Sequence, residues 1–115
     1  MTLLQKIKHA LIKRMLEKEG LQDTLWGSRI LAAHKGDCFT QKERQYSLSW
    51  VTCAAAELLS DDDCPYLLED PVLLVQGGQF AYHVANNNFY WSAVTYVAIN
   101  KRVRQLKGLE LWDKL

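Results

Sequence analysis

The sequence predicts a mostly helical α+β domain, in which three N-terminal helices, a β-hairpin and a long C-terminal helix share one core. Three observations lead to this prediction. Residues 71–100 contain no Asp, Glu, Lys or Arg, as expected of a buried segment, because an unpaired charge is costly in an apolar interior. Apolar residues recur at helical spacing on both sides of this segment. Within it, Gly77-Gly78 separates two short apolar runs, which is typical of a hairpin turn.

The size and composition of the chain are those of an ordinary globular protein. Its 115 residues, 49% hydrophobic and 23% charged, predict one domain spanning 1–115 that needs no metal or disulfide for stability. The net charge of +1 gives no overall field to attract nucleic acid or an anionic membrane. No secretory signal or transmembrane segment is recognisable, and three cysteines without CxxC spacing argue against a disulfide framework or a zinc site. We therefore expect a soluble, cytoplasmic protein with no cofactor, no metal and no membrane partner.

The first predicted helix spans Thr2 to Glu19 and ends at Gly20, a residue suited to a left-handed cap. At about 100° per residue, its aliphatic and polar side chains fall on opposite arcs. The apolar arc consists of Leu3, Leu4, Ile7, Leu11 and Met15, and the polar one of Lys6, His9, Lys13 and Glu17. We expect the apolar arc to face the core and the basic back to face solvent, rather than a role for this helix on a membrane or on nucleic acid.

The second predicted helix spans Thr24 to Lys35, with Asp23 as its N-cap and Gly36 as its stop. Gly27 lies in its interior and costs about 1 kcal/mol relative to alanine. The sequence therefore supports this helix less strongly than the first one, unless a neighbouring group packs against the glycine.

The third predicted helix has the clearest start. Thr40 and Glu43 have the spacing of a capping box, in which each side chain satisfies a backbone N–H of the first turn. The following run, 45–56, is uncharged, which is typical of a central helix. We expect this helix to end before the acidic residues at 61–63 and to be followed by a loop between Pro65 and Pro71.

Val72–Gln76 and Gln79–Ala85 are expected to pair as a β-hairpin joined by Gly77-Gly78. The reason is that a type I′ turn needs positive φ at both central residues, and glycine supplies it. The all-α alternative would require both strands to be loop.

The segment after the three asparagines fits two structures. Phe89–Ile99 is rich in aromatic and β-branched residues, which suits a third strand. Helical spacing of the apolar residues, Asn88 as N-cap and Gly108 as stop favour a helix from Phe89 to Lys107, which we expect. The tail, Leu109–Leu115, is then expected to dock back on the core.

The motifs of large enzyme families are absent, among them the phosphate loop, GxGxxG, HExxH, the EF-hand loop and GxSxG. The leading hypothesis is therefore a protein–protein interaction module that occupies a partner's surface, as an adaptor, an immunity-type protein or a viral or phage inhibitor would. Asp61, Asp62 and Asp63 are the candidate partner-binding residues, since the helix dipole does not explain them and they would attract a basic partner. A solvated acidic loop is the simpler explanation. A homodimer formed through exposed aromatic residues is left open.

A polar and aromatic ligand pocket is expected around the asparagine turn. Its candidate residues are Tyr82, His83, Asn86, Asn87, Asn88 and Trp91. The aromatic rings could stack on a ligand and the amides could hydrogen-bond it. The alternative is turn chemistry, because asparagine tolerates left-handed conformations and caps helices.

Two further functions stay open. The first is nucleic-acid binding by basic groups of the first and last helices, if those helices pack side by side and their cations converge on phosphates. The residues of this patch are Lys6, Lys13, Lys101, Arg102, Arg104 and Lys107. The second is a small Cys-dependent enzyme, with Cys38 as nucleophile and His34 or His83 as its base. Ordinary surface cations and a chance Cys–His combination are the simpler explanations of these residues.

Overall fold

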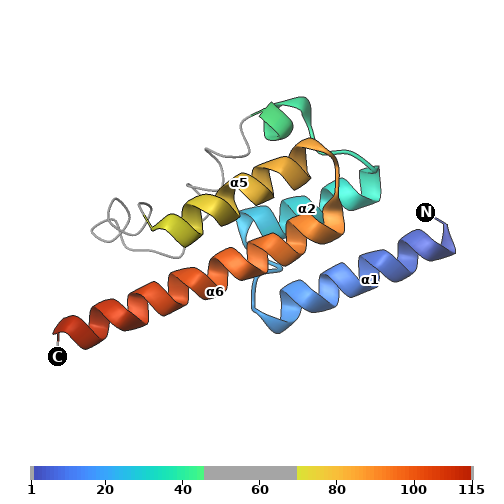
Figure 1. The fold of residues 1–115 in the computed structure, drawn as a ribbon. Coiled ribbons are helices and arrows are strands. Elements are labelled where there is room, and N and C mark those ends of the chain that lie inside the picture. The colour runs from blue at the N-terminus through green and yellow to red at the C-terminus, as the bar shows by residue number, and fades with distance from the viewer. Residues whose placement is uncertain (1, 46–69, 115) are drawn as a thin grey trace.

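The long elements of the structure are all helices (Figure 1). The computed structural model describes residues 2–45 and 70–114, and no strand occurs within them. The helices are α1 (Leu3–Lys18), α2 (Leu25–Gly36), α5 (Pro71–Ala85) and α6 (Phe89–Lys114), and a short helical segment covers 41–45. Outside the described residues lie most of the third predicted helix, the cysteines Cys53 and Cys64, and the acidic run Asp61–Asp63.

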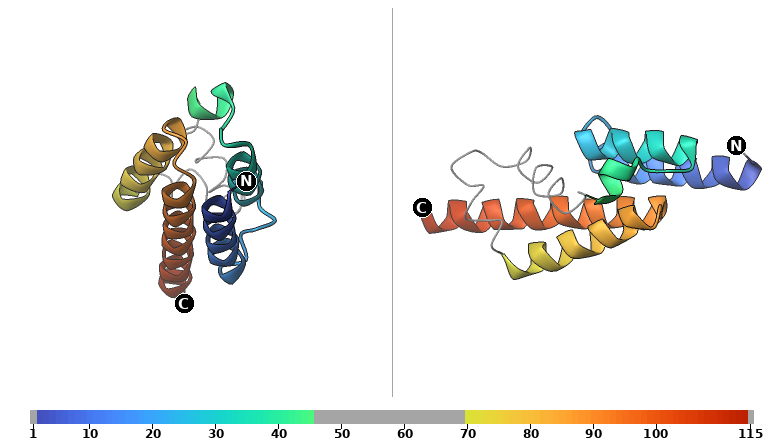
Figure 2. Two further views of the ribbon diagram at one scale, coloured as in Figure 1. Left: turned by 90° about the vertical axis from the view of Figure 1, so that its right-hand side faces the viewer. Right: turned by 90° about the horizontal axis from the view of Figure 1, so that it is seen from above.

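Helix α6 is the central element and contacts α1, α2 and α5 (Figures 1 and 2). Helices α5 and α6 form an antiparallel pair joined by the short turn at 86–88. Helix α1 lies on the other side of α6 and runs in the same direction, and α2 packs against both α1 and α6. The first turns of α1 extend past the N-terminal end of α6.

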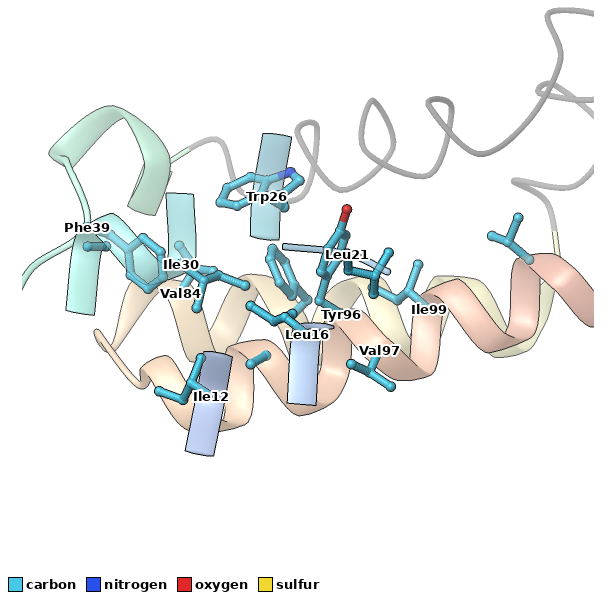
Figure 3. Packing of buried hydrophobic residues seen from close by; sticks show 14 of the residues in the cluster. Ile12, Leu16, Leu21, Trp26, Ile30, Phe39, Val84, Tyr96, Val97 and Ile99 are labelled. Carbon is cyan, nitrogen blue, oxygen red and sulfur yellow. The ribbon is translucent and has the colours of Figure 1, made fainter. Parts of the chain in front are cut away.

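The core lies between these helices and contains aromatic side chains from three of them (Figure 3). The indole of Trp26 meets the ring of Phe80 edge to face at 5.0 Å, and Phe80 lies 6.0 Å from Tyr96. The buried hydrophobic cluster consists of Ile12, Leu16, Leu21, Trp26, Ile30, Ala33, Phe39, Leu73, Phe80, Val84, Ala93, Tyr96, Val97, Ile99 and Val103. Burial of these side chains is the main term that stabilises the bundle.

The hydroxyl of Thr24 joins three segments of the chain. Its Oγ1 accepts a hydrogen bond from the Gly27 amide at 3.1 Å, so Thr24 and not the predicted Asp23 is the N-cap of α2. The same oxygen accepts from the Tyr96 hydroxyl at 2.8 Å and donates to the Leu21 carbonyl at 2.7 Å. The hydroxyl proton and both lone pairs of Thr24 Oγ1 are thereby all engaged in hydrogen bonds.

The two glycines expected to shape the α1–α2 region do so. Gly20 has φ +70°, the left-handed conformation predicted for the end of the first helix. Gly27 is buried, and a Cβ at this position would overlap the carbonyl oxygen of Leu21. Only glycine at this position lets the backbone of α2 lie so close to the Leu21 carbonyl, and this packing offsets the cost of Gly27 in helix propensity.

The predicted β-hairpin is wrong, and with it the α+β class, because 71–85 form helix α5. Asp70 caps this helix by accepting from the Leu73 amide at 3.1 Å, and Pro71 occupies the first turn, where a proline fits best. The buried residues recur at helical spacing. They are Leu73, Gly77, Phe80 and Val84. Two interior glycines cost about 1 kcal/mol each in helix propensity, and burial of this face outweighs that cost. These residues are not loop either, as the all-α alternative required.

The inward face of α1 also differs from the prediction. Ile12 and Leu16 are the buried residues of this helix, and Met15 is half-buried against the core. The other four aliphatic residues of the predicted core arc are 50–75% exposed. They are Leu3, Leu4, Ile7 and Leu11. Ile12 and Leu16 are one turn apart, which lets both enter the space between α2 and α6 while the longer aliphatic arc faces solvent.

Helix α6 begins as predicted and continues further. The Asn88 side chain accepts from the Trp91 amide at 3.2 Å, which confirms the N-cap and the choice of helix over strand for Phe89–Ile99. The predicted stop at Gly108 is wrong, because the helix continues to Lys114. A single glycine lowers helix propensity by about 1 kcal/mol, and no proline follows to end the helix. The tail therefore extends α6 and does not fold back.

Candidate functional site

An open groove of about 560 Å³ lies where the α5–α6 turn meets the start of α1 and the end of α2. Its lining residues are Gln5, Lys8, Ile12, His34, Asp37, Asn86, Asn87, Asn88, Phe89, Tyr90 and Trp91. The structure thus brings four of the six predicted pocket residues, the three asparagines and Trp91, to one groove. Tyr82 and His83 lie beside the groove, because His83 stacks on Trp91 and Tyr82 contacts His83.

The three asparagines hydrogen-bond the backbone, as the turn-chemistry alternative expects. Asn86 Nδ2 donates to the Tyr82 carbonyl at 2.8 Å, and Asn88 Oδ1 accepts from an amide of the first turn of α6. Asn87 has φ +54° and accepts at Oδ1 from the Phe39 amide at 2.8 Å, which fastens the segment after α2 to the α5–α6 turn. These amides build the corner, which leaves fewer of their donors and acceptors for a ligand.

Four rings form a continuous cluster at this corner, which we call the aromatic corner: Tyr82, His83, Tyr90 and Trp91. Tyr82 meets His83 edge to face at 5.6 Å, His83 stacks on Trp91 at 6.2 Å, and Tyr90 meets Trp91 edge to face at 5.6 Å. Tyr82, Tyr90 and Trp91 are 66%, 42% and 50% exposed. Large rings held in contact yet half open to water form a preorganised apolar surface.

A pair of histidines adjoins the groove, and one of the two, His34, lines it. His9 Nδ1 and His34 Nδ1 are 3.0 Å apart, their rings stack at 5.2 Å, and His34 meets Phe89 edge to face at 5.3 Å. Burial lowers the pKa of both imidazoles, and the neighbouring cations Lys8 for His34 and Lys35 for His9 lower it further. For His34, Asp37 partly opposes the effect of burial on the pKa.

Sequence reasoning did not select the histidine pair, Lys8 or Asp37 as parts of this site. Gln5 Nε2 donates to Asp37 Oδ1 at 3.2 Å and thereby joins the first turn of α1 to the C-cap of α2, and both residues line the groove. The position of His9, about one turn before the buried Ile12, indicates that His9 lies near the face of α1 that turns inward. The sequence places His9 on the solvent-facing arc instead, because lysines share that arc.

The predicted basic patch is occupied in part by ion pairs within the chain. Lys101 Nζ lies 3.7 Å from the Glu19 carboxylate. Arg102 donates to both carboxylate oxygens of Asp70, at 2.9 and 2.8 Å, and these hydrogen bonds lower the pKa of Asp70. Two members of the patch are therefore engaged in holding α6 to its neighbours.

The remaining cations of the patch do not meet at one place. About 20 Å of helix separates Lys6 from Glu19, the residue beside Lys101, at about 1.5 Å per residue. Lys13 lies between them and pairs with Glu17 at 3.9 Å. Arg104 is exposed on α6, and the side chain of Lys107 lies outside the described part of the chain. Nucleic-acid binding stays a prediction without support from this arrangement.

The predicted catalytic residues Cys38 and His83 lie in different surroundings. Cys38 is exposed and its Sγ donates to the Phe39 carbonyl at 2.9 Å, while His83 belongs to the aromatic corner. Within the described residues, no hydrogen bond joins Cys38 to His34 or His83, so the enzyme hypothesis gains no support. Across the same residues, no group of three or more His, Cys, Asp or Glu is placed to hold a metal ion.

None of the described helices combines the length and apolar character needed to cross a bilayer. Comparison with protein-family models, with curated proteins and with solved structures finds no match to this chain, so the functional inference rests on the geometry of the site.

Proposed function

We propose that this protein is an interaction module that binds a partner protein through the aromatic corner and the groove beside it. The observation that carries the proposal is the set of three half-exposed rings, Tyr82, Tyr90 and Trp91, at the ends of two helices, where Tyr90 contacts Trp91 and His83 links Trp91 to Tyr82. Trp and Tyr are the side chains most enriched among residues that dominate binding energy at protein interfaces.

The surroundings of the corner suit a protein partner better than a small ligand. The groove is open, and its asparagine amides are engaged with the backbone. Lys8 and Asp37 place opposite charges on its lining, which matches the polar rim of a typical interface around an apolar centre. A small ligand would instead need an enclosed cavity with unengaged polar groups.

The corner is also held by contacts within the chain, which favours binding. Tyr82 and His83 belong to the last turn of α5, and Tyr90 and Trp91 to the first turn of α6. The Asn87–Phe39 hydrogen bond fixes the turn between them. Because the rings are already held by contacts with one another, little side-chain entropy is lost when a partner covers them.

The experiment compares capture of partner proteins from a cell lysate by the wild type, by Trp91→Ala and by a matched control, Leu74→Ala. Leu74 is 60% exposed on α5 and lies about two helical turns from Tyr82. Loss of a hot-spot ring costs about 2 kcal/mol or more, which is roughly thirty-fold in affinity. We expect Trp91→Ala to lose the captured protein and Leu74→Ala to keep it, with both variants melting cooperatively.

A third variant separates the corner from the acidic run. Asp61, Asp62 and Asp63 changed together to Asn should leave capture unchanged if the aromatic corner is the docking surface. If capture depends on the aspartates and not on Trp91, the acidic run is the docking surface and this proposal is wrong.

A further inference from the structure

We propose that the outer face of α1 binds an anionic lipid surface. The face consists of Leu3, Leu4, Ile7 and Leu11, which we call the outer stripe. These four residues are between 50% and 75% exposed and fall within an arc of about 100°. This inference goes beyond the proposed function, because it concerns another surface and another class of partner.

The solvent-facing side of a surface helix is ordinarily polar, whereas the outer stripe faces solvent and is apolar. Helix α1 already buries Ile12 and Leu16 against the bundle, so it has one apolar face for the core and a second for solvent. The sequence favoured a core role for the outer stripe over membrane contact, because two acidic residues, Glu17 and Glu19, lie among the bases of this helix. In the structure the stripe faces outward, and both acidic residues lie at the other end of the helix, where Glu17 pairs with Lys13 and Glu19 lies beside Lys101.

Charge on the same helix is complementary to anionic headgroups. Residues 2–14 contain four cations and no acidic residue. The cations are Lys6, Lys8, Lys13 and Arg14, and within the described residues only Lys13 forms an ion pair, with Glu17. An aliphatic stripe bordered by lysines is the pattern of a helix lying in the membrane interface, with lysine side chains reaching the headgroups.

The position of α1 allows this contact. The helix lies at the edge of the bundle and its first turns project beyond α6 (Figure 2). The stripe occupies these first turns, while Arg14 and Lys18 continue the same arc further along the helix. The N-terminal end would therefore enter the acyl boundary while these two cations stay at headgroup level.

Other occupants fit the stripe less well. A second copy of the chain, packed face to face, would bring the same uncompensated cations together. Protein interfaces are depleted in lysine and enriched in aromatic residues, which describes the aromatic corner and not the outer stripe.

The test is co-sedimentation of the full chain with two kinds of vesicle, phosphatidylcholine with phosphatidylserine and phosphatidylcholine alone. The test variant is Leu4→Ser with Ile7→Ser. The matched control is Leu74→Ser with Val75→Ser, which removes two equally exposed aliphatic side chains from α5. We expect binding to the anionic vesicles only, a loss of at least about tenfold in the test variant, and a change below about twofold in the control.

Several results would overturn the inference. Equal binding to both vesicles, insensitivity to about 0.5 M salt, or an equal loss in the control would each do so. So would sedimentation of the wild type as a dimer that Leu4→Ser with Ile7→Ser dissociates, or binding to polyglutamate without binding to vesicles. Trp91→Ala should retain vesicle binding, so that failure of the partner-protein proposal and failure of this one are distinguishable.

Discussion

His9 and His34 face one another across the α1–α2 interface through Nδ1 atoms 3.0 Å apart, which is hydrogen-bonding distance. In such a pair one nitrogen donates and the other accepts, which requires at least one neutral imidazole. When both rings are protonated, two N–H groups and two positive charges oppose one another. The charges that act on the pair are already mostly cationic, with Lys8, Lys13 and Lys35 opposed by Asp37.

The histidine pair predicts that the free energy of unfolding decreases in weak acid. Burial, then the neighbouring positive charges, hold the folded-state pKa of both rings below the ordinary value of 6.5. The unfolded chain therefore binds more protons below about pH 6.5, and stability that is complete above that pH is lost as the pH falls below it. Urea denaturation at about pH 7.5, 6.5 and 5.5 measures this. His9→Gln should flatten the profile, and a wild-type stability that is constant over this range would contradict the prediction.

Arg29 and Glu43 predict a large cost for breaking one ion pair. Arg29 donates to both oxygens of Glu43, at 2.7 and 2.9 Å, and Glu43 is 1% exposed. Burial raises the pKa of Glu43, but hydrogen bonds from Arg29 and Thr40 outweigh this and leave it lowered. Arg29→Met should cost about 2–3 kcal/mol, somewhat less than for a fully buried pair because Arg29 is partly exposed.

The control for this prediction is the exposed pair of Lys13 and Glu17. Lys13→Met should change the free energy of unfolding by less than about 0.5 kcal/mol, since water screens the charges. Equal effects of the two substitutions in chemical denaturation would show that burial does not set the cost.

Gly27 and Gly78 predict opposite effects of the same substitution. A Cβ at Gly27 would overlap the Leu21 carbonyl, so Gly27→Ala should destabilise the protein by about 2–4 kcal/mol through a forced shift of α2. At Gly78 a Cβ meets open space, and Gly78→Ala should stabilise helix α5 by about 0.5–1 kcal/mol. Thermal melts of both variants test the helical assignment of α5 directly, because alanine at the turn of a hairpin would be destabilising.

Asn87 combines a left-handed backbone with a hydrogen bond, and two substitutions separate these roles. Asn87→Gly keeps the φ of +54° without strain but removes the bond to the Phe39 amide, at a cost of about 1 kcal/mol. Asn87→Ala loses the bond and adds about 1 kcal/mol or more of backbone strain. We expect the order of melting temperatures to be wild type, Gly, then Ala, and a glycine variant less stable than the alanine variant would contradict it.

Local signals in the sequence predicted several ends of elements correctly, although the N-cap of α2 is Thr24 and not Asp23, and α6 does not end at Gly108. The Thr40–Glu43 capping box is present, with hydrogen bonds of 2.9 and 3.1 Å, and the Asn88 N-cap and the left-handed Gly20 are also confirmed. Each depends on a few neighbouring residues and on short-range hydrogen bonding. Such features can be read from sequence because tertiary contacts alter them little.

The errors arose where tertiary packing decides between local alternatives. Gly77-Gly78 is a good hairpin turn in isolation, and α5 forms because burial of Phe80 and Val84 one helical turn apart outweighs two glycines. In α1, the face that carries Ile12 and Leu16 turns inward, although another arc of this helix carries more aliphatic residues. Tertiary packing also explains why the sequence predicted only part of the candidate site. The asparagines and aromatic residues adjoin in sequence, whereas His9 and His34 meet only in the fold.

The saturated hydroxyl of Thr24 also fixes the axial register of the bundle. Apolar packing is non-directional and tolerates small slides of one helix along another. The hydrogen bond from Tyr96 does not, since a slide of α6 by one residue moves the phenol by about 1.5 Å and leaves both hydroxyls mismatched. One threonine oxygen thus selects a single alignment of α6 with α2 among several that the hydrophobic contacts alone would allow.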